Sequence, residues 1–171
     1  ISARIRDSYI GLHEHGHAHS IECWREGRLV GGLYGVGFAR VFCGESMFSR
    51  ETDASKVAMA WLVASLQKVG AELLDCQFTT SHLSSLGAVE IPQSQYLKLL
   101  SHAQRRYSPE ELAAARALAD ELGEGLVDGI GAGDAATAPL GLPAGFAALR
   151  SSAFGASSPG NVIAQSFTHT S

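Results

Sequence analysis

The chain has 171 residues, of which 46% are hydrophobic, and a net charge of −4. This length fits one domain, or one domain with a tail, and the hydrophobic content is sufficient for a buried core. The net acidity weighs against a non-specific nucleic-acid binder, but residues 1–106 are nearly balanced, with 11 Lys/Arg and 10 Asp/Glu. No apolar run approaches the roughly 18 residues of a membrane-spanning helix. Three cysteines without a CxxC pair indicate a reducing, cytoplasmic compartment.

The first third of the chain predicts a helix followed by three strands. Apolar residues at helical spacing predict a helix over residues 2–15, which Gly16 would end. A strand over 18–24 and a second over 28–36, joined at the dipeptide Glu26-Gly27, predict a hairpin. A third strand is expected over 38–42.

The middle of the chain predicts a long helix and several shorter elements. Asp53 is a candidate N-cap for a helix with an apolar stripe that Gly70 closes. The further elements expected are a buried strand over 72–78, a short helix capped by Thr80 and ended at Gly87, a strand over 89–91 and a helix beginning at Ser94.

This order of elements predicts an α/β (α+β) fold, with a mixed, mostly antiparallel sheet and flanking helices. The part from the long helix to the strand over 89–91 resembles the second half of a GNAT-type acyltransferase. Such enzymes cradle the acetyl-CoA pyrophosphate in a Q/R-x-x-G-x-G/A loop at the start of the long helix. Residues 49–56 occupy this position and contain no glycine. The sequence therefore predicts an acyl donor other than acetyl-CoA.

The character of the chain changes near residue 106. Ser108-Pro109-Glu110-Glu111 is a capping box that predicts a helix ending near Leu122. Residues 123–171 are rich in Gly, Ala and Ser, which is typical of irregular structure. We therefore expect a catalytic domain over 1–106 and a helix with a tail over 107–171.

Two polar clusters are candidate sites. His13, His15, His17 and His19 alternate, but the predicted helix would separate them and no ligand partner stands at metal-site spacing, so no metal is expected. Asp75 and Gln77 would share one face of the predicted strand over 72–78. A buried polar pair serves either a structural hydrogen-bond network or a site, and both interpretations stay open, as they do for Glu45.

Taken together, several short motifs over roughly residues 1–100 resemble the leucyl/phenylalanyl-tRNA–protein transferases. Their combination in one order is more specific than any single motif. The matching runs are Leu12-His13 with Gly16, Ala18-His19-Ser20-Ile21-Glu22, Leu29-Val30-Gly31-Gly32-Leu33-Tyr34-Gly35, Gly44-Glu45-Ser46-Met47-Phe48-Ser49-Arg50, Ala54-Ser55-Lys56, Asp75-Cys76-Gln77, and His82 with Ser85-Leu86-Gly87-Ala88.

The resemblance implies a cytoplasmic bacterial enzyme with a GNAT-like catalytic domain and no cofactor. Such enzymes transfer Leu, Phe or sometimes Met from the 3′ aminoacyl-adenosine end of aminoacyl-tRNA. The acceptor is a protein with N-terminal Arg or Lys, which is thereby marked for degradation through the N-degron pathway. A monomer without membrane contact is expected.

The resemblance also implies roles for particular residues. Gln77 would accept a hydrogen bond from the attacking amine, Asp75 would polarise Gln77, and Glu45 would hold or orient the amine. The residues implied for the side-chain pocket are Leu33, Phe42, Leu62, Leu66 and Leu74. Supporting roles are implied for Ser46, Met47, Ser55, Lys56 and His82.

This sequence departs from the family pattern in two places. The N-terminal domain of the family, and a Trp just ahead of the position of Ile1, are not in the sequence, and Gln93 stands where the family usually has Arg. Loss of that charge predicts weaker tRNA binding. Two alternatives therefore stay open: a GNAT-like transferase with a different aminoacyl donor, and a truncated, inactive domain that binds peptide or RNA.

Overall fold

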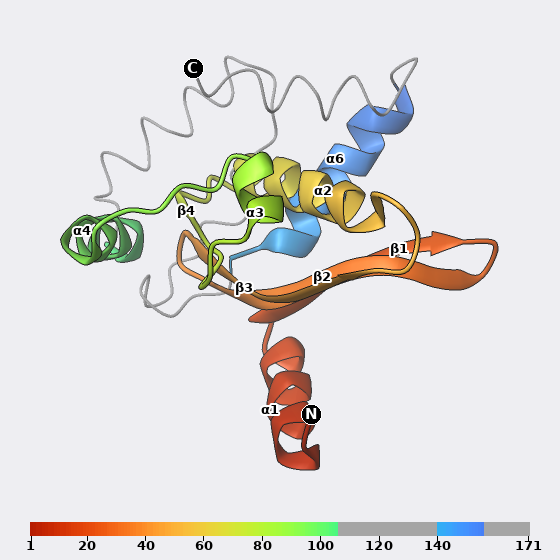
Figure 1. Cartoon of the computed structure of the whole chain (residues 1–171), viewed down its shortest axis with the longest axis horizontal. Coiled ribbons are helices and arrows are strands. Elements are labelled where there is room, and N and C mark those ends of the chain that lie inside the picture. Colours follow the sequence, from red (N-terminus) through yellow and green to blue (C-terminus); the bar gives the residue numbers. More distant parts are fainter. Residues whose placement is uncertain (106–139, 156–171) are drawn as a thin grey trace.

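The computed structural model describes residues 1–105 and 140–155 (Figure 1). One four-stranded sheet has the order β1-β2-β3-β4, and within it only the β3–β4 pair is parallel. The expected mixed, mostly antiparallel sheet with flanking helices is therefore confirmed, and the likeness to the GNAT fold stays a prediction. The elements are α1 (Ala3–Glu14), β1 (Ala18–Arg25), β2 (Arg28–Phe38), β3 (Val41–Ser49), α2 (Ala54–Lys68), β4 (Leu73–Asp75), α3 (Ser81–Ser85), α4 (Gln93–Gln104) and α6 (Leu142–Gly155).

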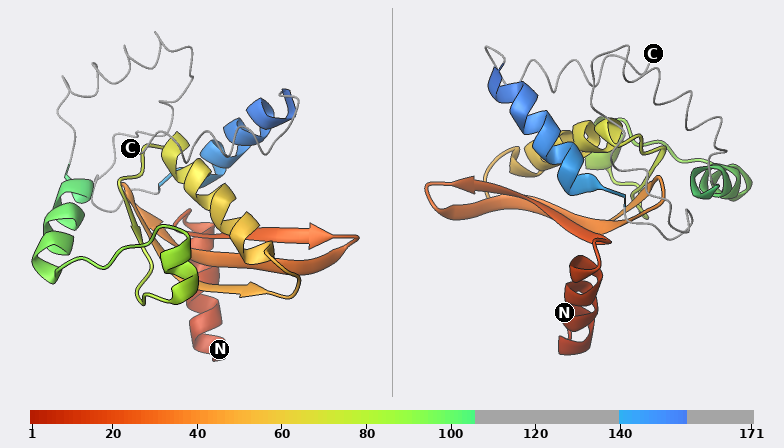
Figure 2. Two further views of the ribbon diagram at one scale, coloured as in Figure 1. Left: turned by 45° about the horizontal axis from the view of Figure 1, so that its top comes forward. Right: turned by 180° about the vertical axis from the view of Figure 1, so that it is seen from behind.

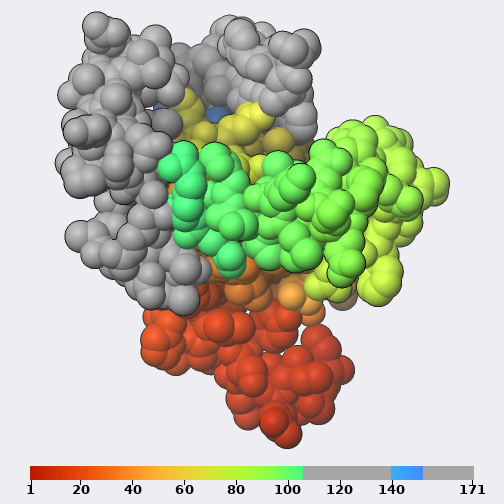
Figure 3. Space-filling model, turned by 90° about the vertical axis from the view of Figure 1, so that its left-hand side faces the viewer, coloured from red at the N-terminus to blue at the C-terminus, as the bar shows by residue number. Residues whose placement is uncertain are grey.

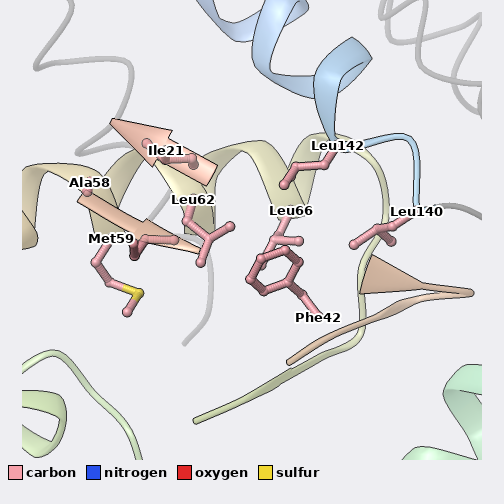
Figure 4. Packing of buried hydrophobic residues seen from close by; sticks show 9 residues of the cluster. Ile21, Phe42, Ala58, Met59, Leu62, Leu66, Leu140 and Leu142 are labelled. Atoms are coloured by element: carbon pink, nitrogen blue, oxygen red, sulfur yellow. The ribbon is translucent and has the colours of Figure 1, made fainter. Parts of the chain in front are cut away.

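The two faces of the sheet are covered differently. Helices α2 and α6 lie on one face, whereas α1 projects from the other (Figures 1 and 2). The apolar face of α2 packs on the sheet, and Leu62, Leu66 and Phe42 meet at its centre (Figure 4). The buried cluster consists of Ile21, Leu33, Phe42, Ala58, Met59, Leu62, Leu66, Leu140 and Leu142. None of the described helices is long and apolar enough to cross a membrane.

The predicted hairpin and its turn are confirmed. Glu26 and Gly27 both have positive φ, at 49° and 74°, which is the backbone of a two-residue turn that matches the twist of its strands. Gly16, with φ of 80°, follows the end of α1 as expected. These signals are local, and for this reason the sequence reveals them.

The predicted third strand was misplaced. The chain turns at Ala39, where φ is 48°, and β3 then runs from Val41 to Ser49 and pairs with β2 along its length. The polar run from Gly44 to Ser49, which lies beyond the strand expected over 38–42, is therefore part of the sheet. Long-range pairing with β2 overrides the weak strand propensity of these residues.

Two further strand predictions were wrong in extent or existence. The strand expected over 72–78 is limited to β4, because the chain leaves the sheet after Asp75 and Gln77 adopts a φ of 48°. The strand expected over 89–91 does not form, and Val89 is 78% exposed. Without a partner strand, three residues of β-forming sequence do not make a strand.

The two predicted caps behave differently. Thr80 caps α3 as expected, since its Oγ1 accepts a hydrogen bond from the Leu83 N–H at 3.1 Å. Asp53 occupies the N-cap position of α2 with φ of 63° and makes no side-chain cap bond. Its carboxylate instead pairs with Lys56 Nζ at 2.7 Å.

Part of the C-terminal region is helical. The helix predicted over 108–122 lies outside the described residues. The expectation of irregular structure was wrong for residues 142–155, which form α6, and Leu140, Leu142 and Leu149 are buried. At Gly145 a Cβ would lie 2.6 Å from Val69 Cγ1, so α6 approaches α2 closely. The division at residue 106 stays a prediction, but part of the later segment contributes to the core of the earlier one.

Replacing Leu149 with Ala should lower the free energy of unfolding by about 2–5 kcal/mol, because removal of a buried leucine side chain leaves a cavity. Leu149 is completely buried, and the measurement is urea unfolding. The matched control is Ala148→Ser on the exposed side of the same helix, with a change within about 0.5 kcal/mol. Equal stability of the Leu149→Ala chain and the wild type would contradict the packing of α6.

Candidate active site

The three predicted catalytic residues meet where β3 runs parallel to β4. Cys43 on β3 is in register with Asp75, the last residue of β4. Glu45 stands two residues further along β3, and Gln77 two residues beyond Asp75. The parallel pair thus brings together residues that are about thirty positions apart in the sequence.

Glu45 is the extra residue of a β-bulge. Gly35 pairs with Gly44 and Tyr34 pairs with Ser46, so Glu45 has no partner on β2. Bulges redirect a side chain and are frequent beside active sites. The Glu45 Oε2 accepts a hydrogen bond from Gln77 Nε2 at 3.3 Å. The bulge therefore directs this carboxylate toward the end of β4.

Asp75 holds Gln77 through the backbone. Its Oδ1 accepts a hydrogen bond from the Gln77 N–H at 2.9 Å, and its Oδ2 accepts one from the Tyr96 hydroxyl at 2.9 Å. This Asp turn accommodates the left-handed backbone of Gln77. The prediction that Asp75 and Gln77 share a strand face was wrong, because β4 ends at Asp75. The contact between them is to the peptide N–H of Gln77, and the side-chain amide bonds to Glu45 instead.

Burial and the two carboxylates raise the pKa values of the hydroxyl and thiol groups around the site. Burial, followed by the hydrogen bond to Asp75, raises the pKa of Tyr96 to about 12. Burial, followed by the charges of Asp75 and Glu45, raises the pKa of the Cys43 thiol to about 11. On the other side of the sheet, burial and then Glu45 raise the pKa of Tyr9. At neutral pH these groups are hydrogen-bond donors, and Cys43 is not a thiolate nucleophile.

The site opens into a cleft of about 1470 Å³ between α2, β4, α3 and α4. Its polar wall includes Asp75, Gln77, Tyr96 and Lys56. An apolar wall faces them, and consists of Met59, Val63, Leu73, Leu74, Leu83 and Leu86. A space that joins a few polar groups to an apolar wall is typical of a ligand site.

The residues predicted for the side-chain pocket lie together, but mostly beneath this cleft. Leu33, Phe42, Leu62 and Leu66 belong to the core, with at most 6% of each exposed. Leu74 is half-buried against that core and also lines the cleft. Their role as a pocket stays a prediction, and Leu74 marks the place where core and cleft meet.

The predicted supporting residues are spread around the site. Lys56 lines the cleft, and Ser46 is exposed on β3. Met47 packs against the core cluster, and the buried Ser55 donates its N–H to Ser49 Oγ at 3.3 Å. Within the described part of the chain, His82 Nε2 is buried without a hydrogen-bond partner.

Two of the alternating histidines bond to the backbone where α1 meets β1. His13 Nδ1 lies 2.8 Å from the Ala18 carbonyl oxygen, and His19 Nε2 lies 2.9 Å from that of Gly16. These bonds hold α1 to the start of β1. Among residues 1–105 and 140–155, no group of three or more His, Cys, Asp or Glu could hold a metal ion.

Sequence reasoning missed two tyrosines of this site. Tyr9 and Tyr96 lie in segments predicted to be helical, and neither of them was given a role from the sequence. The available signal was chemical: a half-buried tyrosine hydroxyl needs a hydrogen-bond partner. The partners are Glu45 and Asp75, which only the packing of α1 and α4 brings near.

The Tyr96–Asp75 contact predicts a loss of stability at high pH. The pKa of Tyr96 is about 12 in the folded chain and 10 ordinarily. The stability that its protonated hydroxyl contributes to the fold is therefore fully present below pH 10. It is lost as the pH rises from 10 through about 12. Urea unfolding between pH 9 and 12 should show a smaller decline for Tyr96→Phe than for the wild type. Equal declines would contradict the contact.

Comparison with known proteins agrees with the predicted resemblance. The family model for leucyl/phenylalanyl-tRNA protein transferase matches residues 1–101. Leucyl/phenylalanyl-tRNA–protein transferases are similar to this chain in Novosphingobium aromaticivorans (81% identity over the whole chain), Rhizorhabdus wittichii (63% over 60% of the chain) and Zymomonas mobilis (58% over 63%). The chain spans 65%, 42% and 40% of these proteins. The match over more than half of the chain shows that it belongs to the leucyl/phenylalanyl-tRNA protein transferase family.

Proposed function

We propose that this chain carries the catalytic part of an aminoacyltransferase, which transfers Leu or Phe, and in some members Met, from aminoacyl-tRNA to protein N-termini. Family membership supports this proposal. The observation that carries it is the hydrogen-bonded set of Glu45, Gln77 and Asp75, of which Gln77 and Asp75 line an open cleft.

The proposed reaction is aminolysis of an ester. The neutral α-amine of the acceptor attacks the aminoacyl carbonyl carbon, and a C–N bond forms while the C–O bond to the tRNA breaks. The proton lost by the amine ends on the departing 3′ oxygen. Because an ester is already activated, correct placement of the two substrates supplies much of the rate acceleration.

Gln77 is suited to orient the attacking amine. Its Nε2 donates to Glu45, and this bond fixes which way the amide faces. The Oε1 atom then serves as the acceptor for an amine proton. A neutral amide is a poor base, so Gln77 orients the nucleophile and does not remove its proton. Asp75 supports this geometry through the Gln77 N–H.

The carboxylates favour a cationic acceptor. Glu45 and Asp75 lie on one side of the site, where an acceptor with N-terminal Arg or Lys brings a side-chain cation. We propose that this charge match selects such proteins, which the transferred residue then marks for degradation in the cytoplasm. The apolar wall around Leu74 and Met59 fits the Leu or Phe side chain of the donor.

Transfer of labelled leucine tests the proposal directly. Leu-tRNA is offered with a peptide that has N-terminal Arg, and with the same peptide that has N-terminal Glu. The assay uses this chain alone, and this chain completed with the part of the Novosphingobium protein that it does not span. Label on the Arg peptide only is the expected result in the completed protein.

Each other outcome decides between the alternatives. Label from a different aminoacyl donor, but not from Leu- or Phe-tRNA, contradicts the proposed donor. Binding of Leu-tRNA by the completed protein without any transfer favours an inactive binding domain. Equal labelling of the Arg and Glu peptides contradicts selection by charge.

A further inference from the structure

Helix α4 is held to the β3–β4 edge of the sheet chiefly by polar contacts. Of its twelve residues only Ala103 is buried. In Figure 3, residues of α3, the segment after it and α4 form a continuous band across the outer surface. Near its start, the Tyr96 hydroxyl bonds to Asp75. At its end, the Arg40 guanidinium donates to the carbonyl oxygens of His102 at 2.6 Å and Arg105 at 3.0 Å.

The Arg40 attachment of α4 lies outside the proposed site, whereas the Tyr96 attachment is part of it. Arg40 also pairs with Glu72 at 2.8 Å, and only 11% of its side chain is exposed. This contact anchors the helix end and lies away from the site. Tyr96, in contrast, bonds to a carboxylate oxygen of the proposed catalytic set. A helix that only needed anchoring already has the Arg40 contact.

The geometry around Asp75 depends on both of its oxygen atoms. One accepts from Gln77 and the other from Tyr96. Asp75 ends a strand of three residues, so the sheet restrains its backbone on one side only. A carboxylate with a single hydrogen bond rotates more freely about its terminal torsion angle than one with a bond to each oxygen. The bond from Tyr96 therefore restrains the acceptor on which the Gln77 turn depends.

We propose that Tyr96 is a positioning residue of this site: its hydroxyl holds the Asp75 carboxylate in the orientation that keeps Gln77 in its left-handed turn. Gln77 then directs its side-chain amide to Glu45 on the bulge of β3. The Tyr96 hydroxyl on α4 thus helps to hold Asp75, Gln77 and Glu45 in fixed positions relative to one another. The positioning stands on these contacts alone, whereas its consequence for catalysis rests on the proposed function.

The conservative variant Tyr96→Phe removes the hydroxyl and keeps the ring. Its first readout does not require activity: the exchange rate of the Gln77 backbone N–H with solvent, measured by NMR on the full chain. Loss of the Asp75 restraint is expected to raise this rate several-fold. The second readout is aminoacyl transfer, where kcat is expected to fall roughly tenfold while the KM for Leu-tRNA is unchanged.

Glu72→Gln is the matched control, because it weakens the other attachment of α4 and leaves Tyr96 in place. It is expected to lower stability without changing Gln77 exchange or kcat. Unchanged Gln77 exchange in Tyr96→Phe would overturn the proposal. Equal losses of kcat in both variants would also overturn it, because Tyr96 would then act only by attaching α4 to the sheet, as Arg40 does.

The two proposals fail in different ways. If the wild type transfers no amino acid even when completed with the missing part of the family protein, the proposed function fails. The exchange measurement still decides the positioning role. If exchange rises in Tyr96→Phe but kcat stays at the wild-type value, the catalytic consequence is overturned.

Discussion

Replacement of Gln77 with Ala should lower the rate of aminoacyl transfer by about a hundredfold, the effect typical of losing a group that positions the nucleophile. The variant removes both the amide oxygen proposed to orient the amine and the bond to Glu45. Since Gln77 is exposed, the fold should be preserved. The measurement is kcat for labelled leucine transfer, together with urea unfolding.

Asp75→Asn separates charge from shape at the neighbouring position. It keeps an oxygen that can accept from Gln77 or Tyr96, but removes the charge that faces both. An intermediate loss of kcat is expected. The control for Gln77→Ala is Gln104→Ala, which deletes the same amide group at the end of α4 and should leave transfer unchanged. Wild-type kcat in both Gln77→Ala and Asp75→Asn would remove the pair from the mechanism.

Replacement of Leu62 with Trp tests whether the predicted pocket is open space or core. Leu62 is only 1% exposed and lies within the cluster of Ile21, Phe42 and Leu66 (Figure 4). A larger ring has no room there, so the free energy of unfolding should fall by about 1–3 kcal/mol or more. Urea unfolding gives this value, and transfer kinetics give the KM for Leu-tRNA.

The matched control is Val57→Trp on the same helix, where the side chain is 49% exposed. It should change stability by no more than about 0.5 kcal/mol. A Leu62→Trp chain with wild-type stability and a raised KM for Leu-tRNA would contradict the core assignment. That result would show that the leucines beneath the cleft move apart and admit the donor side chain.

The predictions that held rest on short-range signals. The hairpin turn at Glu26 and Gly27, the cap at Thr80 and the apolar stripe of α2 each depend on residues within a few positions of one another. The family resemblance, which also comes from the sequence, brought Glu45, Asp75 and Gln77 to attention. The structure places these three residues in contact, although their chemical roles stay proposals.

The predictions that failed involved pairing or packing between distant segments. The third strand was expected over 38–42, yet pairing with β2 places it at Val41–Ser49 and makes Glu45 the extra residue of a bulge. Residues 142–155 were expected to be irregular, yet they form a helix that packs on α2 and buries Leu142 and Leu149. In both cases a tertiary contact outweighs weak local propensity.

The sequence by itself determined the helices and hairpin that local periodicity and turn chemistry specify, and the family to which the chain belongs. Only the tertiary structure decided how the site is assembled: the bulge that directs Glu45, the early end of β4 that turns Gln77, and the bond from Tyr96 to Asp75. The reason is physical. Periodicity records which face of an element is apolar, whereas a hydrogen bond between distant residues depends on register and helix placement, which no local pattern encodes.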